Sequence, residues 1–455
     1  MADARLQDLN TRPLQPGRYV LYWMQAAQRA ASNPALEHAI TEANRLDQPL
    51  RVVFGLTPHF PEANERHYRF MLEGLREVAT ALAQRGVGFT VEPGEPSQVA
   101  LRLARMASLV VCDRGYLRLQ KQWREQVAAR APCRVVQVET EVVVPVDEAS
   151  DKEEAGAYTL RPRLTKLLGE YLQPLPTGQV KRRWDEGEAN GGPGDTRPLH
   201  GNGPRGVAAL AGQGSASRFI GGTSQALKLL RRFLREQLST YHEQSNQPDR
   251  DATSHLSLYL HFGQISPLQV ALEAQAVGGD GAARFLEQLI VRRELAINFV
   301  HRNPQYDRYD CIVGWQAQTL GQHVEDARPV LYTPDQLEAA GTHDEYWNAA
   351  MREMLLTGFM HGYMRMYWGK KIIEWSPDPR EAFARLLHLN NKYFVDGRDP
   401  LSFANVAWCF GKHDRPFMER AIFGKVRYMN AAGLKRKFDM AGYVRRVTGL
   451  TERGE

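Results

Sequence analysis

The sequence has little of what defines several common protein classes. It contains only 4 cysteines in 455 residues, Cys112, Cys133, Cys311 and Cys409, and none are spaced as C-x-x-C. That excludes zinc-ribbon and clustered iron–sulfur patterns, and so few cysteines are typical of a reducing compartment. No window approaches the ~18 apolar residues of a membrane span, and the polar N-terminus lacks the apolar stretch of a signal peptide. We therefore expect a soluble, cytoplasmic protein.

A glycine fingerprint for dinucleotides is also missing. The first predicted strand, 19–23, runs into Trp23-Met24-Gln25-Ala26-Ala27 instead of G-x-G-x-x-G, which disfavours a dehydrogenase-type site. The composition is otherwise ordinary, with 43% apolar and 24% charged residues, so a disordered or fibrous chain is excluded. The net charge of +6 permits a polyanionic partner without requiring one.

The first 150 residues alternate between short apolar runs and amphipathic segments. We expect strands at 19–23, 50–56, 87–91, 108–112, 134–138 and 142–146, and helices at 35–46, 66–85, 97–106 and 120–130. This alternation predicts β-α-β units and a Rossmann-like parallel sheet.

Residues 185–222 hold eleven glycines, a composition typical of a linker or an exposed loop. Lys181-Arg182-Arg183, just before it, has the pattern of a solvated charge run. Beyond Ser224 the pattern is helical, with predicted helices at 225–241, 267–275, 282–298, 344–357, 361–374 and 379–389. The sequence thus predicts an α/β domain (1–180), a Gly-rich linker (181–223) and an all-α domain (224–455).

Three hydroxyl residues, Thr253, Ser254 and Ser257, precede a predicted helical turn. Ser and Thr side chains at a helix N-terminus can form an anion site, and they can equally be ordinary N-caps.

One helical face carries residues 361, 365, 368, 372 and 375. Trp368 and Trp375 lie two turns apart there, which suits either an electron relay between indoles or a core stripe. Arg365 on the same face needs a partner if it is buried, and Asp396 is a plausible one.

Aromatic and basic residues are unevenly distributed. Residues 301–410 contain seventeen Phe, Trp or Tyr, including five of the 8 tryptophans. Residues 410–455 hold eleven Lys or Arg against five Asp or Glu, interleaved with aromatic residues. That mixture is typical of a nucleic-acid surface with base stacking, or of a solvated basic tail.

Together these segments resemble a class II cyclobutane pyrimidine dimer photolyase of the photolyase/cryptochrome family. The residues that carry the resemblance are LSLYLHFGQIS (256–266), FLEQLIVRRELAINF (285–299), THDEYWNAA (342–350), HGYMRMYWGKKIIEW (361–375), LNNKYFVDGRDP (389–400), FGKVRYMNAAGLKRKFD (423–439) and, near the N-terminus, YVLYWMQAAQR (19–29).

The resemblance implies light-driven DNA repair by a monomer. Such enzymes hold FAD in a helical domain, bind double-stranded DNA and flip the pyrimidine dimer out of the duplex. The light-excited, fully reduced flavin lends the dimer an electron, and the protein supplies positioning and electrostatics. A second chromophore, a deazaflavin or a folate, is possible in the N-terminal domain.

The resemblance also implies residue roles. The positions matching FAD-binding residues are Tyr241, Thr253, Ser254, Ser257, Arg365, Asn390 and Asp396. Of these, Arg365 and Asp396 match an ion pair beside the isoalloxazine, and Asn390 matches the amide facing flavin N5. Trp368, Trp347 and Trp375 match the photoreduction relay, from proximal to distal. The implied dimer and DNA contacts are Met366, Trp408, Arg292 and Arg415, and the implied catalytic set is Asn390, Arg365, Asp396, Gln288 and Met366.

The sequence departs from the family in three places. Gln288 stands where the family usually has a glutamate that contacts the dimer, and the adjacent Glu287 should point elsewhere, about 100° round the helix. Leu258 replaces a usual proline, and the loop between Trp408 and His413 is one residue shorter. Gln288 leaves open a cryptochrome-like photoreceptor that does not repair DNA. A third possibility is a DNA-binding flavoprotein whose FAD is structural.

Overall fold

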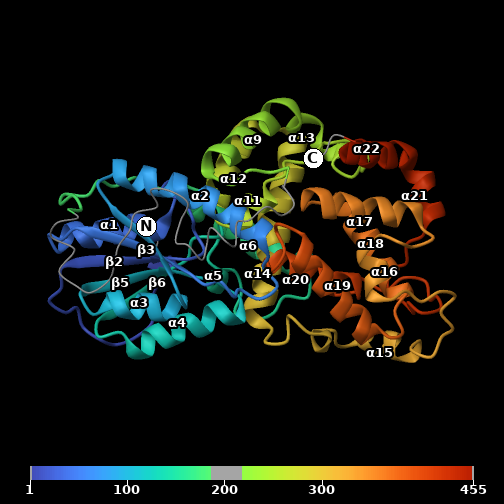
Figure 1. Cartoon of the computed structure of the whole chain (residues 1–455), viewed down its shortest axis with the longest axis horizontal. Coiled ribbons are helices and arrows are strands. Elements are labelled where there is room, and N and C mark those ends of the chain that lie inside the picture. Colours follow the sequence, from blue (N-terminus) through green and yellow to red (C-terminus); the bar gives the residue numbers. More distant parts are fainter. Residues whose placement is uncertain (1–2, 186–217, 453–455) are drawn as a thin grey trace.

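A computed structural model describes residues 3–185 and 218–452 (Figure 1). It has a sheet flanked by helices at one end and a body of helices at the other, as expected (Figure 1). Most of the Gly-rich segment, 186–217, lies outside the described residues. Lys181, Arg182 and Arg183 are exposed, in agreement with a solvated charge run.

The sheet has six strands in the order β1-β6-β5-β2-β3-β4. Their bounds are β1 Leu6–Asp8, β2 Tyr19–Met24, β3 Leu50–Leu56, β4 Gly88–Pro93, β5 Ala107–Asp113 and β6 Arg134–Val138. All neighbouring strands are parallel except β1, which pairs antiparallel with β6. Strands β2, β3 and β5 are buried throughout, which explains why they read as continuous apolar runs. The predicted parallel sheet is confirmed, and the short polar β1 was not predicted.

The helices that connect these strands are α1 Pro34–Arg45, α2 Glu65–Gln84, α3 Pro96–Ala104 and α4 Arg118–Arg130. The predicted strand at 142–146 is wrong. Its backbone is held by side chains instead of a neighbouring strand: Glu294 accepts from the Val143 N–H at 2.6 Å, and Arg5 donates to the Val142 and Val143 carbonyls. The segment leads into the short helix α5 Val146–Ala149 and then α6 Ala157–Tyr171.

The remaining regular structure of the described chain consists of helices and one isolated bridge between Arg420 and Gly424. The bounds are α9 Thr223–Glu236, η2 Leu238–Thr240, α10 Tyr241–Gln244, α11 Ser257–His261, α12 Pro267–Val277, α13 Gly279–Leu286, η3 Glu287–Arg292, α14 Arg293–Arg302, η4 Tyr309–Cys311, α15 Trp315–Gln322, α16 Pro334–Glu338, α17 Glu345–Thr357, α18 Gly362–Glu374, α19 Pro379–Tyr393, α20 Pro400–Cys409, α21 Ala431–Lys437 and α22 Met440–Glu452.

The predicted helix 282–298 is corrected by the structure, because it is three segments with the π-helical η3 in the middle. Seven helices were not predicted: α5, α6, α15, α16, α20, α21 and α22. One hydrophobic core extends from the sheet into α9–α14, so the two halves share an interior, and a second core lies within the helical half. No helix among the described residues is long and apolar enough to cross a membrane.

Candidate functional site

A cavity of about 440 Å³ opens among the helices of the C-terminal half. Its walls come from α10, α13, η3, α14, α18, α19 and α20 together with the segments around Asn246, Thr253 and His413. Nine of the residues singled out by the sequence line it: Tyr241, Thr253, Gln288, Arg292, Arg365, Met366, Trp368, Asn390 and Trp408. Positions spread over about 170 residues of sequence therefore meet at one site.

The π-helical segment η3 forms one wall of the cavity and contributes Gln288 and Arg292 to it. π-Helical turns are rare and occur often at functional sites, since the extra residue re-aims the side chains around it. Glu287 points away from the cavity, as expected, and pairs with Arg161 of α6 at 2.8 Å and with Arg292 at 3.3 Å. Burial alone raises the pKa of Glu287, but its hydrogen bonds and charge contacts with these two arginines lower it overall.

The ion pair expected from the sequence is present beside this cavity. An Nη of Arg365, on α18, lies 3.0 Å from Oδ1 of the buried Asp396, and its Nε donates to the Met360 carbonyl at 3.0 Å. The guanidinium also lies 3.9 Å from the centre of the Phe394 ring. Arg365 is thus fixed by charge, hydrogen bonding and stacking together.

Asn390 of α19 is 5% exposed and faces the same space. Its Nδ2 donates to Asn391 Oδ1 at 3.1 Å. That contact orients the amide and leaves a carbonyl oxygen and a second N–H for another partner.

The hydroxyl cluster does not cap a helix. Helix α11 has only 5 residues, and its N-cap, Leu256, makes no side-chain cap bond. Ser254 Oγ accepts from the Leu256 N–H at 3.4 Å, Thr253 lines the cavity, and Ser257 is half-buried at the first helical position. Interpreting these residues as ordinary N-caps is therefore wrong, and their hydroxyls remain candidates for ligand contacts.

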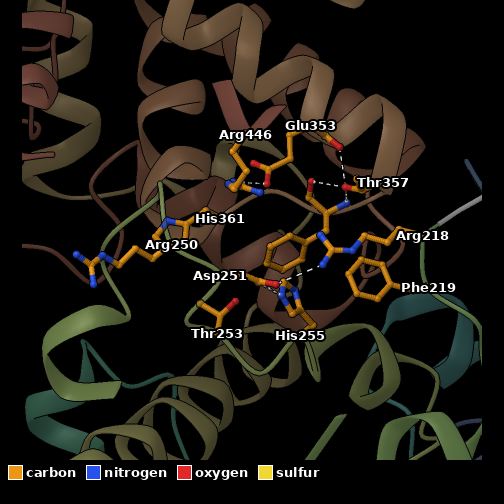
Figure 2. Close-up of a pocket in the computed structure, with 11 residues that line it drawn as sticks. Arg218, Phe219, Arg250, Asp251, Thr253, His255, Glu353, Thr357, His361 and Arg446 are labelled. Carbon is orange, nitrogen blue, oxygen red and sulfur yellow. Dashed lines mark hydrogen bonds and ion pairs between the residues drawn. The ribbon is translucent and has the colours of Figure 1, made fainter. Parts of the chain in front are cut away.

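A smaller pocket lies next to Thr253 (Figure 2). Asp251 and His255 point toward one another there and are 2.5 Å apart, and Arg218 lies 3.3 Å from the same carboxylate (Figure 2). Burial raises the pKa of Asp251, but the hydrogen bond and charge of His255 outweigh it and hold that pKa well below its usual value. This ion cluster fixes the segment that bears Thr253.

The three relay candidates form a continuous aromatic column behind the cavity. Trp368 lines the cavity, and its ring centre lies 6.4 Å from that of Trp347, with the planes 15° apart. Trp347 in turn lies 5.5 Å from Trp375. All three are at most 2% exposed, so each also belongs to the core, and the two interpretations of the stripe do not exclude each other.

The basic C-terminal segment is less open than its sequence indicated. Phe410 and Phe423 are buried, whereas Trp408, Phe417 and Tyr428 are half-buried. Arg415 is exposed, 5.5 Å from the Phe417 ring centre, and it does not line the cavity. Arg427 lies between Phe417 and Trp408, with its guanidinium carbon 4.6 and 6.0 Å from their ring centres.

Several lining residues were missed by the sequence argument: Ser245, Asn246, Arg284, Tyr363, Asn405 and His413. Arg284 could have been found, because it precedes Gln288 by four residues, one helical turn. The others come from loops and separate helices that only the tertiary fold brings together.

The residues present fit FAD. The cavity combines aromatic and aliphatic walls with three cations, Arg284, Arg292 and Arg365, which suit a planar ring joined to phosphates. The indole N–H of Trp368 is buried without a hydrogen-bond partner in the described part of the chain. Buried polar groups usually have a partner, so this N–H is consistent with a bound polar ligand.

Comparison with known proteins shows the family of the chain. The DNA photolyase family model matches residues 20–180. The chain is 48% identical over 450 residues to a deoxyribodipyrimidine photo-lyase of Methanothermobacter thermautotrophicus, covering 98% of this chain and 99% of that protein. It is 39% identical to that of Oryza sativa, covering 96% of this chain and 90% of the relative.

The structural comparison shows the same fold. The crystal structure of an archaeal photolyase from Sulfolobus tokodaii with two FAD molecules aligns with a TM-score of 0.72 at 15% identity, covering 94% of this chain and 89% of that one. That likeness bears on the fold alone, whereas the sequence relatives show the family. The chain therefore belongs to the photolyase/cryptochrome family.

Proposed function

We propose that this protein is a class II deoxyribodipyrimidine photo-lyase that repairs cyclobutane pyrimidine dimers in double-stranded DNA with FAD and light. The observation that carries the proposal is the meeting of nine predicted residues at one cavity, with a tryptophan column leading away from it. Relatives from an archaeon, plants and a marsupial bear that enzyme name at 37–48% identity over most of the chain.

Each group of residues has a part in the proposal. Thr253, Ser254, Ser257 and Tyr241 hold the phosphates and ribityl chain, and the Arg365–Asp396 pair and Asn390 flank the flavin ring. When bound in its fully reduced form, FAD supplies the light-driven electron that splits the cyclobutane ring and recovers it afterwards. Trp408, Met366 and Gln288 receive the flipped dimer, and Arg292 and Arg415 contact DNA.

The proposal also covers the domain organisation, the oligomeric state and the localisation of the protein. It assigns residues 1–180 to an antenna-type domain, 181–223 to a linker and 224–455 to the catalytic domain, in a cytoplasmic monomer. An absorption spectrum of the purified protein tests the cofactor assignment and detects a deazaflavin or folate antenna in the same measurement.

The decisive experiment is repair by reduced protein. Flavin-loaded, fully reduced protein should restore a dimer-containing oligonucleotide under near-UV light and leave it unchanged in the dark. Binding of the same DNA without light-dependent restoration would contradict repair. That outcome would favour the second candidate, a cryptochrome-like photoreceptor, which the glutamine at position 288 supports.

A further inference from the structure

Lys370 is a buried lysine without a carboxylate partner. Its side chain is among the largest fully buried ones, at 1% exposure, and no Asp or Glu of the described residues lies within ion-pair distance of it. Lysines are almost never fully buried unless they are paired, because removing an ammonium from water is costly. The next residue, Lys371, is also buried, but its ammonium pairs with the Glu374 carboxylate at 2.7 Å.

The partner of Lys370 is a backbone carbonyl at the end of another helix. Its Nζ donates to the carbonyl of Cys409, the last residue of α20. The preceding carbonyls are satisfied locally: that of Trp408 accepts from the Gly411 N–H at 2.9 Å, and that of Ala407 accepts from the Phe410 N–H at 3.0 Å. Lys370 thus satisfies the terminal carbonyl and places a cation at the negative end of α20.

The two helices touch closely at this point. A Cβ on Gly369 would lie 2.7 Å from Cys409 Sγ, so only glycine allows α18 to approach α20 this far. The carbonyl that Lys370 holds belongs to Cys409, which lines the cavity directly after Trp408. Any shift of this last turn of α20 therefore moves Trp408.

We propose that Lys370 is a positioning residue for Trp408, whose buried ammonium fixes the end of α20 and with it the wall that receives the pyrimidine dimer. The inference rests on the proposed function, because it takes the occupant of that wall to be the dimer. Lys370 does not itself line the cavity, and it is Lys371 whose ammonium lies near the Trp375 ring. Loss of Lys370 should therefore affect dimer binding and leave flavin photoreduction unchanged.

The test measures dissociation constants in the dark for dimer-containing and undamaged DNA. Lys370→Met removes the donor with little change in volume, and Trp408→Ala removes the wall itself. We expect Lys370→Met to weaken binding of dimer-containing DNA about tenfold, the loss of one hydrogen bond from a charged donor. Binding of undamaged DNA should hardly change, and Lys371→Met, the matched control, should bind both as the wild type does.

A double variant separates positioning from general damage. If Lys370 acts through Trp408, Lys370→Met should cost little further affinity in the Trp408→Ala background. Full additivity, or wild-type dimer binding by Lys370→Met, would overturn the proposal. Failure of the proposed function looks different, since the wild type would then lack light-dependent repair of the dimer or would not prefer dimer-containing DNA at all.

The pH dependence of the preference for dimer-containing DNA can be measured on the wild-type protein. It tests the role of Lys370 even if the variants fold poorly. Burial lowers the pKa of Lys370 to about 8, with Cys409, Asp414 and Arg427 as the charged or titratable groups facing it. Burial raises the pKa of the Cys409 thiol to about 11, and Asp414 and Arg427 pair with each other at 3.0 Å. Of Lys370 and Cys409, Lys370 is the one whose charge changes most between about pH 7 and 9.

A neutral amine is the weaker hydrogen-bond donor, so the wild type should lose preference for dimer-containing DNA over that interval. Lys370→Gln, which donates without a charge, should bind weakly at both ends of it. A wild-type preference that stays constant from about pH 7 to 9 would contradict the role of the charge.

Discussion

Trp347 and Trp368 are joined by two contacts at once. Their rings stack with centres 6.4 Å apart, and Trp347 Nε1 donates to the Trp368 carbonyl at 3.0 Å. The hydrogen bond ties α17 to α18 and fixes the orientation of both rings. Since electron tunnelling falls steeply with distance, such a fixed pair transfers a hole faster than a single jump from Trp368 to Trp375.

The first prediction concerns Trp347→Phe. Phenylalanine keeps most of the volume but is much harder to oxidise, so photoreduction of bound oxidised FAD should slow at least tenfold. Repair by protein reduced chemically beforehand should be unchanged, because the relay is not needed once the flavin is reduced. Flash absorption of the flavin measures the first rate, and product analysis measures the second. Trp315→Phe, outside the column, is the matched control, and unaltered photoreduction in Trp347→Phe would exclude a relay through this residue.

Asp396→Asn should release FAD. The substitution leaves the Arg365 guanidinium, whose side chain is 16% exposed, without its carboxylate beside the cavity. Removing one partner of a buried pair typically costs about 3–5 kcal/mol, so both flavin content and melting temperature should fall. The control is Asp310→Asn, which breaks the exposed pair with Arg380 and should change neither. Full flavin occupancy in Asp396→Asn would show that the pair does not support the cofactor.

Gln288→Glu tests whether the amide limits repair. A carboxyl at this position of η3 could share a proton with a dimer carbonyl, which an amide cannot do. If that limits the wild type, the repair yield per absorbed photon should rise in the variant, with the largest gain at low pH. Glu287→Gln changes the charge of η3 without placing a group in the cavity. Because Glu287 also pairs with the cavity-lining Arg292, the yield of this control is measured at saturating DNA. An unchanged yield would mean that glutamine is adequate.

The sequence predicted the parts of this molecule that depend on local pattern. The buried strands read as apolar runs, and Arg365 on an apolar helix face called for an acid, which Asp396 supplies. Predictions from the sequence were wrong where tertiary contacts determine the local structure. Val142–Val146 resembles a strand, but Glu294 and Arg5 take its backbone hydrogen bonds. The helical period through Gln288 gave no sign of η3, because a π-turn changes the hydrogen-bond partners without changing which residues are apolar.

The cavity-lining residues that come from loops could not be predicted from the periodicity of the sequence. Asn246 and His413 reach the cavity from irregular segments whose course is set by contacts far along the chain, such as that of His413 Nδ1 with the Ala155 carbonyl at 3.2 Å. The family resemblance did identify residues on several separate elements that line the cavity, because matching a family motif does not depend on periodicity. Lys370 lies within one of these motifs (361–375), but its burial and its bond to α20 depend on helix packing.

The buried Glu294 should make stability depend on pH. Burial raises the pKa of its carboxyl to about 8. The carboxyl accepts hydrogen bonds from the Val143 and Val144 N–H groups, and these lower its pKa by less than burial raises it. The folded state therefore keeps a proton that the unfolded chain releases above its ordinary pKa of about 4.5. Stability from this group is present at low pH and is lost as the pH rises toward about 8.

Glu294→Gln separates that effect from the rest of the protein. Glutamine keeps an acceptor oxygen for the two N–H groups and cannot ionise, so the variant should lose less stability than the wild type as the pH rises from about 5 to 8. Between about pH 5 and 8, the free energy of unfolding of the variant should gain about 1 kcal/mol or more relative to that of the wild type. The reason is that one unit of pKa shift corresponds to about 1.4 kcal/mol. Denaturant titrations at both pH values measure it. Glu243→Gln, whose side chain is 68% exposed, should show no such change. Parallel pH profiles for Glu294→Gln and wild type would mean that Glu294 is ionised in the folded state, with Arg293 and Arg5 supplying the compensating charge.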